Sequence, residues 1–387
     1  MSRLEEYVCV GPKKLRCGYT TGTCAAAAAR GAAERLLSGS WPEAVELRTP
    51  AGLWVTAELE QQQVGGGWAC CGVRKDGGDD PDVTHGYLIC ARVRRCPEPG
   101  VRIEGGPGVG RVTLPGLDQP VGAPAINSTP RRMIREQLEQ ALARYAAAGG
   151  FEVEISVPGG EELARHTFNP RLGIRGGLSI LGTSGIVRPM SQQALLQSLY
   201  LEQGSLYARG VRDLLVTPGN YGEAFSRQVL GLRMDRWALC SNYLGEAIDH
   251  AVGCGFSSFL LVGHLGKLAK VAGGAMNTHS RVADGRRETL AAHTALCGGS
   301  RETVARVFDC PTTDAALAVL EADGLLRPVL DSLLAALDRN LRARAGEMEI
   351  GALVFTHPYG ILGRTPGAQR LLALHRALPE TEREEIE

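Results

Sequence analysis

The regular alternation of helical and strand patterns after residue 191 constrains the fold of this chain more than any other feature. Short apolar strands are predicted at 212–217, 237–240, 258–262 and 350–356. Strands joined by helices pair in parallel, and their carboxyl ends then meet at one edge of the sheet. The residues that follow these strands are polar: Asn220, Asn242, His264 and His357. We therefore expect a binding crevice at that edge.

The stretch 259–288 is the strongest candidate for a wall of this crevice. An apolar run from Phe259 to Val262 predicts a buried strand, and a basic helical pattern with Lys267 follows it. A polar cluster comes next: Asn277, Thr278, His279, Ser280, Arg281, Arg286 and Arg287. The alternative is a plain strand–helix unit followed by a solvated loop, because loops are commonly polar.

The first half of the chain has a different pattern, with many strands and two helices. A chain of 387 residues is too long for one core, so two domains are expected, at 1–190 and 191–387. The predicted fold is an α+β N-terminal domain followed by an α/β domain with a mostly parallel sheet. Residues 104–110 match ExGxGxG, the loop with which Rossmann methyltransferases hold their donor. A strand pattern follows where that motif needs a helix, so we expect a β-hairpin and not a standard Rossmann methyltransferase.

Two glycine-rich blocks in the first half are candidate anion cradles. Thr21, Gly22 and Thr23 open a helix with an alanine run, and free backbone N–H groups at a helix start bind anions. The turn formed by Gly182, Thr183, Ser184 and Gly185 is flanked by Arg175 and Arg188. Amides, hydroxyls and arginines together suit carboxylates or a phosphate. The alternatives are a tightly packed capped helix and a structural turn.

The loop 73–86 carries four aspartates around two glycines. A calcium loop is one interpretation, but the ligand spacing of an EF-hand is absent. A catalytic carboxylate pair, Asp79 and Asp80, is another, because adjacent carboxylates raise the pKa of one of them. A solvated turn is the third.

The composition of the chain limits the classes of partner that it is expected to bind. The formal net charge is zero, so the chain as a whole has no bias toward nucleic acid or a membrane surface. No apolar run suits a signal peptide or a membrane span, which predicts a cytoplasmic protein. The eleven cysteines include no CxxC pair, so we expect reduced core thiols and no metal site. A homo-oligomer is compatible with the sequence.

Six blocks of the chain resemble one family: LRCGYTTGTCAAAAA, KDGGDDPDVTHG, GAPAINSTPRRMI, NPRLGIRGGLSILGTSGIVRPMS, CSNYLGEAIDHA and LLVGHLGKLAKVAGGAMNTHSRVADGRRE. They are similar to the CbiD family, the cobalt-precorrin-5B C(1)-methyltransferases of anaerobic cobalamin biosynthesis. The resemblance spans about residues 15–290 and departs at Cys17, where members often have another small residue. It implies S-adenosyl-L-methionine as methyl donor, cobalt-precorrin-6A as product, and cobalt only as part of the substrate macrocycle.

Roles for individual residues are our own hypotheses, because the resemblance supplies no agreed catalytic set. His264 and His279 are the first candidates for a general base, and Asp79 and Asp80 the second. The two glycine-rich blocks, 21–23 and 182–185, are candidates for the donor site. Binding of the polyanionic corrinoid is assigned to polar and basic residues: Lys267, Asn277, Thr278, Ser280, Arg281, Arg286, Arg287, Arg175, Arg188, Asn220 and Asn242.

Three other functions stay open at this point. A nucleotide kinase would use Gly263 to Lys267, but the spacing is shorter than a P-loop and Leu268 replaces its hydroxyl residue. A corrinoid carrier would bind the macrocycle without any dependence on the donor. A corrinoid isomerase would turn over without a donor.

Overall fold

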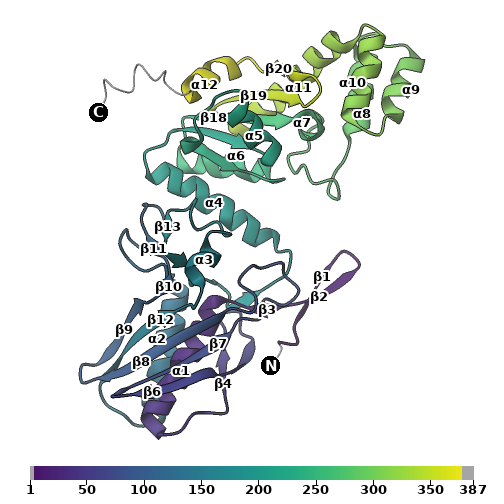
Figure 1. Ribbon diagram of the computed structural model, residues 1–387. Helices are drawn as coiled ribbons and strands as arrows, with labels where there is room; N and C mark the ends of the chain where they lie inside the picture. Colours follow the sequence, from purple (N-terminus) through teal and green to yellow (C-terminus); the bar gives the residue numbers. More distant parts are fainter. Residues whose placement is uncertain (1–3, 377–387) are drawn as a thin grey trace, which may run out of the picture. The chain divides into compact units, whose positions relative to one another are not determined.

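The computed structural model describes residues 4–376. The chain divides into two compact units, Met1–Gln193 and Ala194–Glu387 (Figure 1). We call them unit 1 and unit 2. Each unit has its own hydrophobic core, and helices occur together with mixed sheets. This agrees with the predicted combination of helices and sheets.

Unit 1 is built on a five-stranded sheet in the order β6-β7-β8-β12-β9. The strands are β6 (Glu60–Gly65), β7 (Trp68–Arg74), β8 (Leu88–Cys96), β12 (Gly150–Ser156) and β9 (Gly100–Gly105). All neighbours pair antiparallel except β12 and β9, which are parallel. Helix α1 (Thr21–Ser38) packs on β7 and β8, and α2 (Ser128–Arg144) packs on α1 (Figure 1).

The alanine run of α1 explains how closely this helix approaches the sheet. Ala25 to Ala29 are all fully buried, and the thiol of Cys71 on β7 donates to the Ala28 carbonyl at 3.2 Å. Larger side chains would hold the helix axis farther from the strands, because protein cores have little free volume. Thr20 caps the helix, and its side chain accepts a hydrogen bond from the Thr23 amide.

Short ribbons surround this core. They are β1 (Tyr7–Val10) with β2 (Lys13–Arg16), β3 (Gly18–Tyr19) with β15 (Ile186–Val187), β4 (Ala44–Arg48) with β5 (Trp54–Glu58), β10 (Gly108–Val109) with β14 (Gly177–Leu178), and β11 (Arg111–Val112) with β13 (Ile174–Arg175). A short helix, α3 (Gly160–Ala164), lies beside β10 and β14.

The hairpin expected after residue 104 is wrong. No helix follows the ExGxGxG segment, as expected, but β10 pairs in parallel with β14 and β11 pairs antiparallel with β13. Glycine at position 108 makes this packing possible, because an added Cβ there would lie 1.9 Å from the Val157 carbonyl oxygen. The segment therefore packs against distant backbone, which local strand patterns do not reveal.

Unit 2 is built on a second five-stranded sheet, in the order β17-β16-β18-β19-β20. The strands are β16 (Asp213–Thr217), β17 (Trp237–Leu239), β18 (Ser258–His264), β19 (Glu349–Thr356) and β20 (Gly360–Arg364). The first four in this order pair in parallel, as the alternation after residue 191 predicts, and β20 is antiparallel. The sequence prediction did not include β20.

Helices cover both faces of the unit 2 sheet (Figure 1). On one face, α5 (Asn220–Gln228) and α12 (Ala368–His375) pack on Leu215, Leu260 and Phe355. The opposite face packs against α4 (Gln192–Ala208), α6 (Leu244–Cys254), α7 (Leu265–Ala272) and α11 (Leu326–Ala345). Because both faces are covered, β18 carries apolar side chains on successive residues from Phe259 to Val262.

Further helices lie between α7 and β19: α8 (Arg286–Leu296), α9 (Arg301–Asp309) and α10 (Thr313–Ala322), and then α11. Most of residues 286–345 are therefore helical. A 3₁₀ turn, Met234–Arg236, leads into β17. The charged tail from Pro379, expected to fray, lies outside the described residues.

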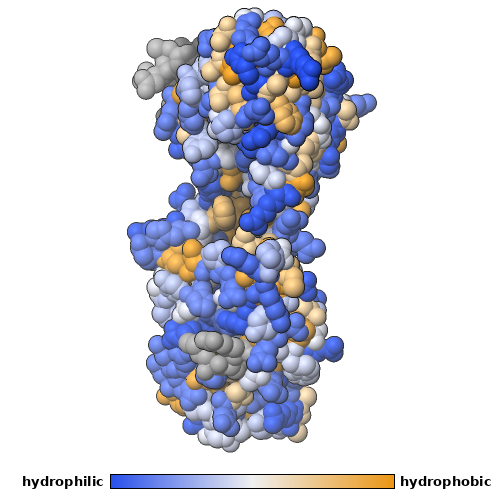
Figure 2. Space-filling model, turned by 90° about the vertical axis from the view of Figure 1, so that its right-hand side faces the viewer, coloured by the Kyte–Doolittle hydropathy of each residue, from blue (hydrophilic) through white to orange (hydrophobic). Residues whose placement is uncertain are grey.

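Within residues 4–376, no helix is long and apolar enough to span a bilayer. On the face shown in Figure 2, hydrophilic side chains are interspersed with hydrophobic ones over both units.

Candidate functional site

A crevice of about 520 Å³ opens at the carboxyl edge of the parallel strands in unit 2. The strand order places β16 between β17 and β18, so the chain leaves β16 toward one side and returns to pair on the other. The carboxyl ends of strands at such a reversal form the usual ligand site of doubly wound sheets. Predicted site residues that line the crevice are Asn242, His264, Lys267, Thr278, His279, Ser280, Arg281 and Arg286.

His264 ends β18 and caps α7. Its Nδ1 accepts a hydrogen bond from the Gly266 amide at 3.1 Å. With Nδ1 as acceptor, neutral His264 carries its proton on Nε2 and is a hydrogen-bond donor there. Burial lowers the pKa of His264, the Asp314 carboxylate opposes this shift, and His357 adds to it. His264 is therefore neutral near pH 7.

Lys267 connects the loops that follow β16 and β17. Its ammonium donates to the Pro218 carbonyl and, at 3.1 Å, to the Ser241 carbonyl. Burial is the main reason that its pKa is lowered. An ammonium has three hydrogens, so one hydrogen of Lys267 is left for a ligand in the crevice.

The second wall is the segment 277–284, which we call the rim loop. Lys270 is 3% exposed, and its ammonium donates to the Thr278 carbonyl at 3.0 Å, the Ser280 hydroxyl at 2.9 Å and the Ala283 carbonyl at 3.2 Å. Thr278 also reaches the loop after β17, because its amide donates to the Asn242 carbonyl at 2.9 Å. One buried lysine on α7 thus holds the rim loop against the crevice.

The exposed residues of the rim loop differ in their freedom to bind a ligand. His279 is exposed, and its Nδ1 accepts the Arg281 amide at 3.1 Å, so its Nε2 is also a donor when neutral. Arg286 already binds Asp284 through two hydrogen bonds, of 2.5 and 2.8 Å. These bonds lower the pKa of Asp284 to about 2. Arg281 is exposed at the crevice.

Three predicted residues of unit 2 are close in sequence but do not line the crevice. Asn220 is the exposed first residue of α5, Asn277 accepts the His279 amide at 3.0 Å, and Arg287 is exposed on α8. Six residues that the sequence interpretation missed do line it: Pro218, Gly219, Tyr221, Gly222, Gly266 and Lys270. The pattern Gly219-x-x-Gly222 between a strand and a helix is the sequence signal that could have identified those at 218–222.

Aromatic rings gather at the same edge. The Tyr221 side chain is exposed, and its ring lies edge-on to His357 with centroids 5.0 Å apart. The His357 and His264 rings lie 5.8 Å apart. The side chains following β16, β18 and β19 therefore converge, as expected from parallel strand ends.

The two predicted donor loops of unit 1 bind each other. The Gly22 amide donates to the Leu181 carbonyl at 3.0 Å, and the Thr20 amide donates to the Gly185 carbonyl at 3.1 Å. The Thr21 hydroxyl accepts the Leu181 amide at 2.9 Å, and the Thr23 hydroxyl donates to the Gly185 carbonyl at 2.7 Å. Thr183 stays exposed, whereas Ser184 accepts the Ile186 amide. The donor site assigned to these loops stays a prediction.

The aspartate loop of unit 1 is held by internal partners. Asp79 accepts the Arg16 amide at 2.7 Å, and Asp80 accepts the Met190 amide at 3.0 Å. Asp76 binds the Arg16 guanidinium through two bonds, of 2.6 and 2.8 Å. These bonds organise a turn, and the catalytic role of Asp79 and Asp80 stays a prediction.

Arg175 and Arg188 also belong to unit 1, where they are exposed, on β13 and after β15. The histidine and lysine of the crevice, in contrast, come from unit 2. The structure thus divides the predicted site residues between the two units.

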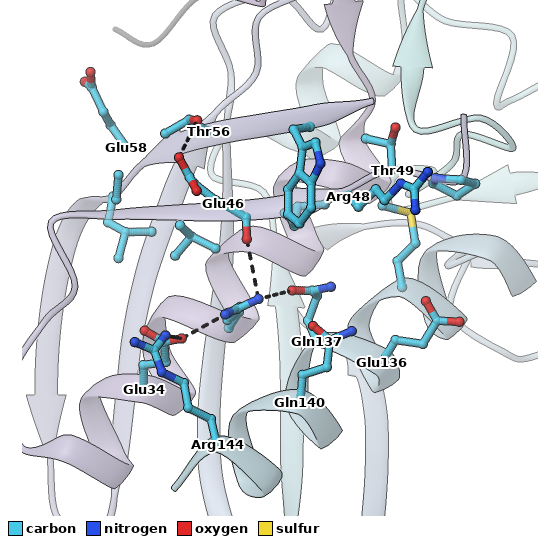
Figure 3. A pocket seen from close by; sticks show the side chains of 18 of the residues that line it. Glu34, Glu46, Arg48, Thr49, Thr56, Glu58, Glu136, Gln137, Gln140 and Arg144 are labelled. Carbon is cyan, nitrogen blue, oxygen red and sulfur yellow. Dashed lines mark hydrogen bonds and ion pairs between the residues drawn. The ribbon is translucent and has the colours of Figure 1, made fainter. Parts of the chain in front are cut away.

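A larger hollow in unit 1, of about 1510 Å³, was not predicted (Figure 3). It lies among α1, α2, β4 and β5, and four arginines and five glutamates line it. Arg30 binds Glu34 at 3.0 Å and Gln137 at 2.8 Å, and Arg144 approaches Glu34 at 3.4 Å (Figure 3). Because five glutamates outnumber the four arginines, this hollow offers a polyanion no net attraction.

Metal chemistry has no evident place in the part of the chain that the structure describes. No group of three or more His, Cys, Asp or Glu side chains there is arranged to hold an ion. The cysteines from Cys9 to Cys310 are free thiols. Burial raises the pKa of several, and it raises that of Cys24 and of Cys240 to about 12.

The protein thus has two units in which helices occur together with mixed sheets, and unit 2 has a polar crevice at a reversal of strand order. The sequence matches the CbiD family over residues 9–189 and the CbiD C-terminal domain over residues 277–366. Together with the relatives described next, these matches show that the chain belongs to the CbiD family.

Several relatives are similar over most of their length. A cobalt-precorrin-5B C(1)-methyltransferase of Ruminiclostridium cellulolyticum is 46% identical over 91% of this chain and 92% of its own. The protein of the same name from Alkaliphilus metalliredigens is 41% identical over 96% and 98%, respectively. A crystal structure of a cobalamin biosynthesis protein (CbiD) from Archaeoglobus fulgidus is 30% identical, covering 73% of this chain and 87% of that chain, with a TM-score of 0.39.

Proposed function

We propose that this protein is a methyltransferase that transfers a methyl group from S-adenosyl-L-methionine to C(1) of cobalt-precorrin-5B, giving cobalt-precorrin-6A in cobalamin biosynthesis. One observation carries the proposal: relatives named for this reaction are 46% identical over 91% of the chain. Cobalt enters only as part of the macrocycle, and we place the reaction in the cytoplasm.

The crevice of unit 2 is the part of the molecule that best suits this reaction. The macrocycle and the methyl donor both carry carboxylates, and Arg281 and Lys267 offer cationic donors at the crevice. A hydrogen bond to a charged group contributes about 1.5–3 kcal/mol, so a few of them support micromolar binding at about −8 kcal/mol. Because Arg286 is shared with Asp284, we expect it to contribute less than Arg281.

Orientation is the main task of the chain in such a transfer. A carbon–carbon bond forms at C(1) as the carbon–sulfur bond of the donor breaks, and S-adenosylhomocysteine leaves with the electron pair. Holding two reactants in line contributes on the order of 7–11 kcal/mol. The residues of the crevice bind and align, while the electron-rich macrocycle supplies the nucleophilic carbon.

His264 and His279 remain the candidates for moving a proton, with Asp79 and Asp80 as second choices. The two histidines accept a backbone amide at Nδ1, so neither offers a lone pair at Nε2 in its neutral form. This geometry favours a role as hydrogen-bond donors toward the macrocycle carboxylates. A role as general base would require the other tautomer and the loss of the amide bond.

The deciding experiment uses S-adenosyl-L-methionine labelled in its methyl group, cobalt-precorrin-5B and the purified full-length protein. We expect label in the macrocycle and release of S-adenosylhomocysteine. Tight macrocycle binding without label transfer would instead identify a corrinoid carrier, and conversion of the macrocycle without the donor would identify an isomerase. Either result contradicts the methyltransferase.

A further inference from the structure

The crevice of unit 2 has features of a nucleoside site that a macrocycle alone does not require. We propose that the adenosine end of the methyl donor binds in this crevice, against Gly219 and Gly222, with the macrocycle outside it along the rim loop. The proposal rests on the methyltransferase function proposed above, and it places the donor in unit 2 instead of in the glycine-rich loops of unit 1.

Gly219 and Gly222 have two different physical roles. An added Cβ at Gly222 would lie 2.8 Å from the Thr217 Cβ and 2.8 Å from the Val262 carbonyl oxygen, so only glycine lets α5 pack this closely on β16 and β18. An added Cβ at Gly219 would meet only the Lys267 ammonium, at 3.8 Å. Gly219 therefore faces the crevice, where its missing side chain leaves room for a ligand beside the backbone.

This pair matches the last two glycines of the dinucleotide fingerprint. In that fingerprint one glycine admits the ligand to the backbone and the next, three residues on, allows close helix–strand packing. Gly219-x-x-Gly222 follows β16 and opens α5, and it lies beside β18 at the reversal of strand order. Thr217 stands where the fingerprint has its first glycine, so the match covers the helix side of the motif.

The surroundings offer one partner for each part of an adenosyl donor. The exposed ring of Tyr221, at the start of α5, is an aromatic face for the adenine. The Asn242 side chain follows β17, the strand whose end commonly binds ribose hydroxyls in doubly wound sheets. The remaining hydrogen of Lys267 suits the amino-acid carboxylate.

Size separates the donor from the macrocycle. A cavity of about 520 Å³ is in the range of sites for ligands of cofactor size, which run from about 300 to 1,000 Å³. A corrinoid with its acetate and propionate arms is far larger than the donor and does not fit within it. His279 and Arg281, in contrast, are exposed on the rim loop, where they can meet the outer carboxylates.

The two glycine-rich loops of unit 1, at 21–23 and 182–185, have less room for a ligand than the crevice. Their hydroxyls and amides bind each other, and an added Cβ at Gly182 would lie 2.3 Å from the Thr20 hydroxyl. Thr21 and Thr23 are 3% and 1% exposed. A donor at these loops would have to displace several buried hydrogen bonds between them.

The test measures binding of S-adenosylhomocysteine to the full-length protein by calorimetry. Gly219→Leu fills the crevice without backbone strain, because Gly219 has the extended φ of 166°. We expect the dissociation constant to rise at least about 100-fold. The matched control is Gly253→Leu, a helical glycine with nothing within 4 Å of an added Cβ, for which we expect wild-type binding. Thermal unfolding checks that both variants are folded.

A second measurement avoids variants. Ultraviolet cross-linking of labelled S-adenosyl-L-methionine to the wild-type protein, followed by peptide mapping, should mark the peptide with Tyr221. Label on the peptide with Thr183 overturns the proposed donor site, and so does unchanged S-adenosylhomocysteine binding by Gly219→Leu. If the wild-type protein still transfers the methyl group, the methyltransferase function stands in either case. If Gly219→Leu loses macrocycle binding but keeps S-adenosylhomocysteine, the crevice is the macrocycle site and the proposal is also overturned. Failure of both donor binding and methyl transfer in the wild-type protein contradicts the function itself.

Discussion

Each unit contains one lysine that is only 3% exposed, but the two lysines are held by different partners. In unit 1, Lys75 on the aspartate loop binds the Asp82 carboxylate at 2.5 Å. In unit 2, Lys270 binds two carbonyls and a hydroxyl of the rim loop, and the nearest carboxylate, Asp284, is 3.8 Å away. The first lysine neutralises a charge, and the second organises neutral backbone.

This difference explains why similar polar loops behave differently. In unit 1 the aspartates of the loop bind Arg16, Lys75 and backbone amides, which hold the loop as a turn. In unit 2 the rim loop is fixed by one buried cation, which leaves His279 and Arg281 exposed at an open crevice. The rim loop keeps these side chains exposed because its anchor, Lys270, comes from the protein interior and not from the loop's own charged side chains.

The largest effect should come from breaking the charged pair of unit 1. Lys75→Met leaves the partly buried Asp82 carboxylate without its cation, and loss of one partner of such a pair costs about 3–5 kcal/mol. The pKa of Asp82 is lowered on balance, because Lys75 and Thr84 outweigh the opposing effect of burial. The stabilisation is therefore present above the ordinary Asp pKa of about 3.9 and is lost as the pH falls through the lower folded value.

Urea unfolding of Lys75→Met at several pH values measures this effect. Lys13→Met is the matched control, because Lys13 is exposed on β2 and its replacement should leave the unfolding free energy nearly unchanged. Equal stabilities of Lys75→Met and Lys13→Met at neutral pH would show that the buried pair does not stabilise unit 1.

The second effect concerns a histidine of unit 2. His375 is fully buried, and within the described residues neither ring nitrogen has a hydrogen-bond partner. Burial, with the nearby Arg236 charge, lowers the pKa of His375 to about 4. Because the unfolded chain binds this proton at about pH 6.5, we expect unit 2 to lose about 3 kcal/mol as the pH falls from about 6.5 to about 4.

Trp237 reports on this loss, because it is buried and is the single tryptophan of unit 2. Its fluorescence can be followed in a protein whose other tryptophans, at 41, 54 and 68, are replaced by Phe. His375→Leu should remove most of the pH slope, and His166→Leu, at an exposed position in unit 1, should keep it. A slope that survives in His375→Leu would assign the acid sensitivity to other groups.

A smaller loss is expected from the lysine of unit 2. Lys270→Met leaves neutral oxygens of the rim loop without a donor, at about 1–3 kcal/mol of unfolding free energy. This loss should be smaller than that of Lys75→Met. Calorimetry should also show weaker macrocycle binding by Lys270→Met, because the rim loop would no longer be held. A stability loss as large as that of Lys75→Met would remove the distinction between the two lysines.

The smallest effect separates two roles of His264. If Nε2–H is a donor, His264→Gln keeps a comparable N–H group and should lose about tenfold or less in rate, and His264→Ala should lose more. Protonation of Nδ1 would break its hydrogen bond with the Gly266 amide and disturb the His264 ring. Because burial lowers the pKa of His264, the wild-type rate should fall only as the pH drops below the ordinary range of histidine. Label-transfer rates over pH 5–8 measure both. An equal, large loss in Gln and Ala variants would indicate a general base.

Much of unit 2 was predictable because apolar strand patterns and helical patterns alternate regularly along its sequence. Apolar runs bounded by helical patterns predicted the strands β16 to β19, and parallel pairing then predicted that His264 and Asn242 lie at one edge. The sequence prediction did not include the antiparallel β20, since a short strand with glycines at both its first and fourth positions shows little alternation.

The contacts of unit 1 were less predictable because they join distant segments. Thr21 and Leu181 are far apart in sequence, and no local pattern shows that their loops bind each other. The same holds for Lys270, whose partners lie on a following loop of irregular backbone. The spacing of Gly219 and Gly222 is visible in the sequence, but their different roles follow only from the positions of Thr217, Val262 and Lys267 in the structure.

The pairing of β18 with β19 has a consequence for how the crevice forms. This pairing brings Ser258 beside Glu349, so the five helices α7 to α11 form a long excursion that must close before the sheet is complete. Closing such a loop is slow compared with forming local helices. A ligand that needs His264 in place binds only the finished sheet, so its binding adds to the stability of unit 2 by mass action. Donor analogues should therefore act as folding stabilisers for newly made chains.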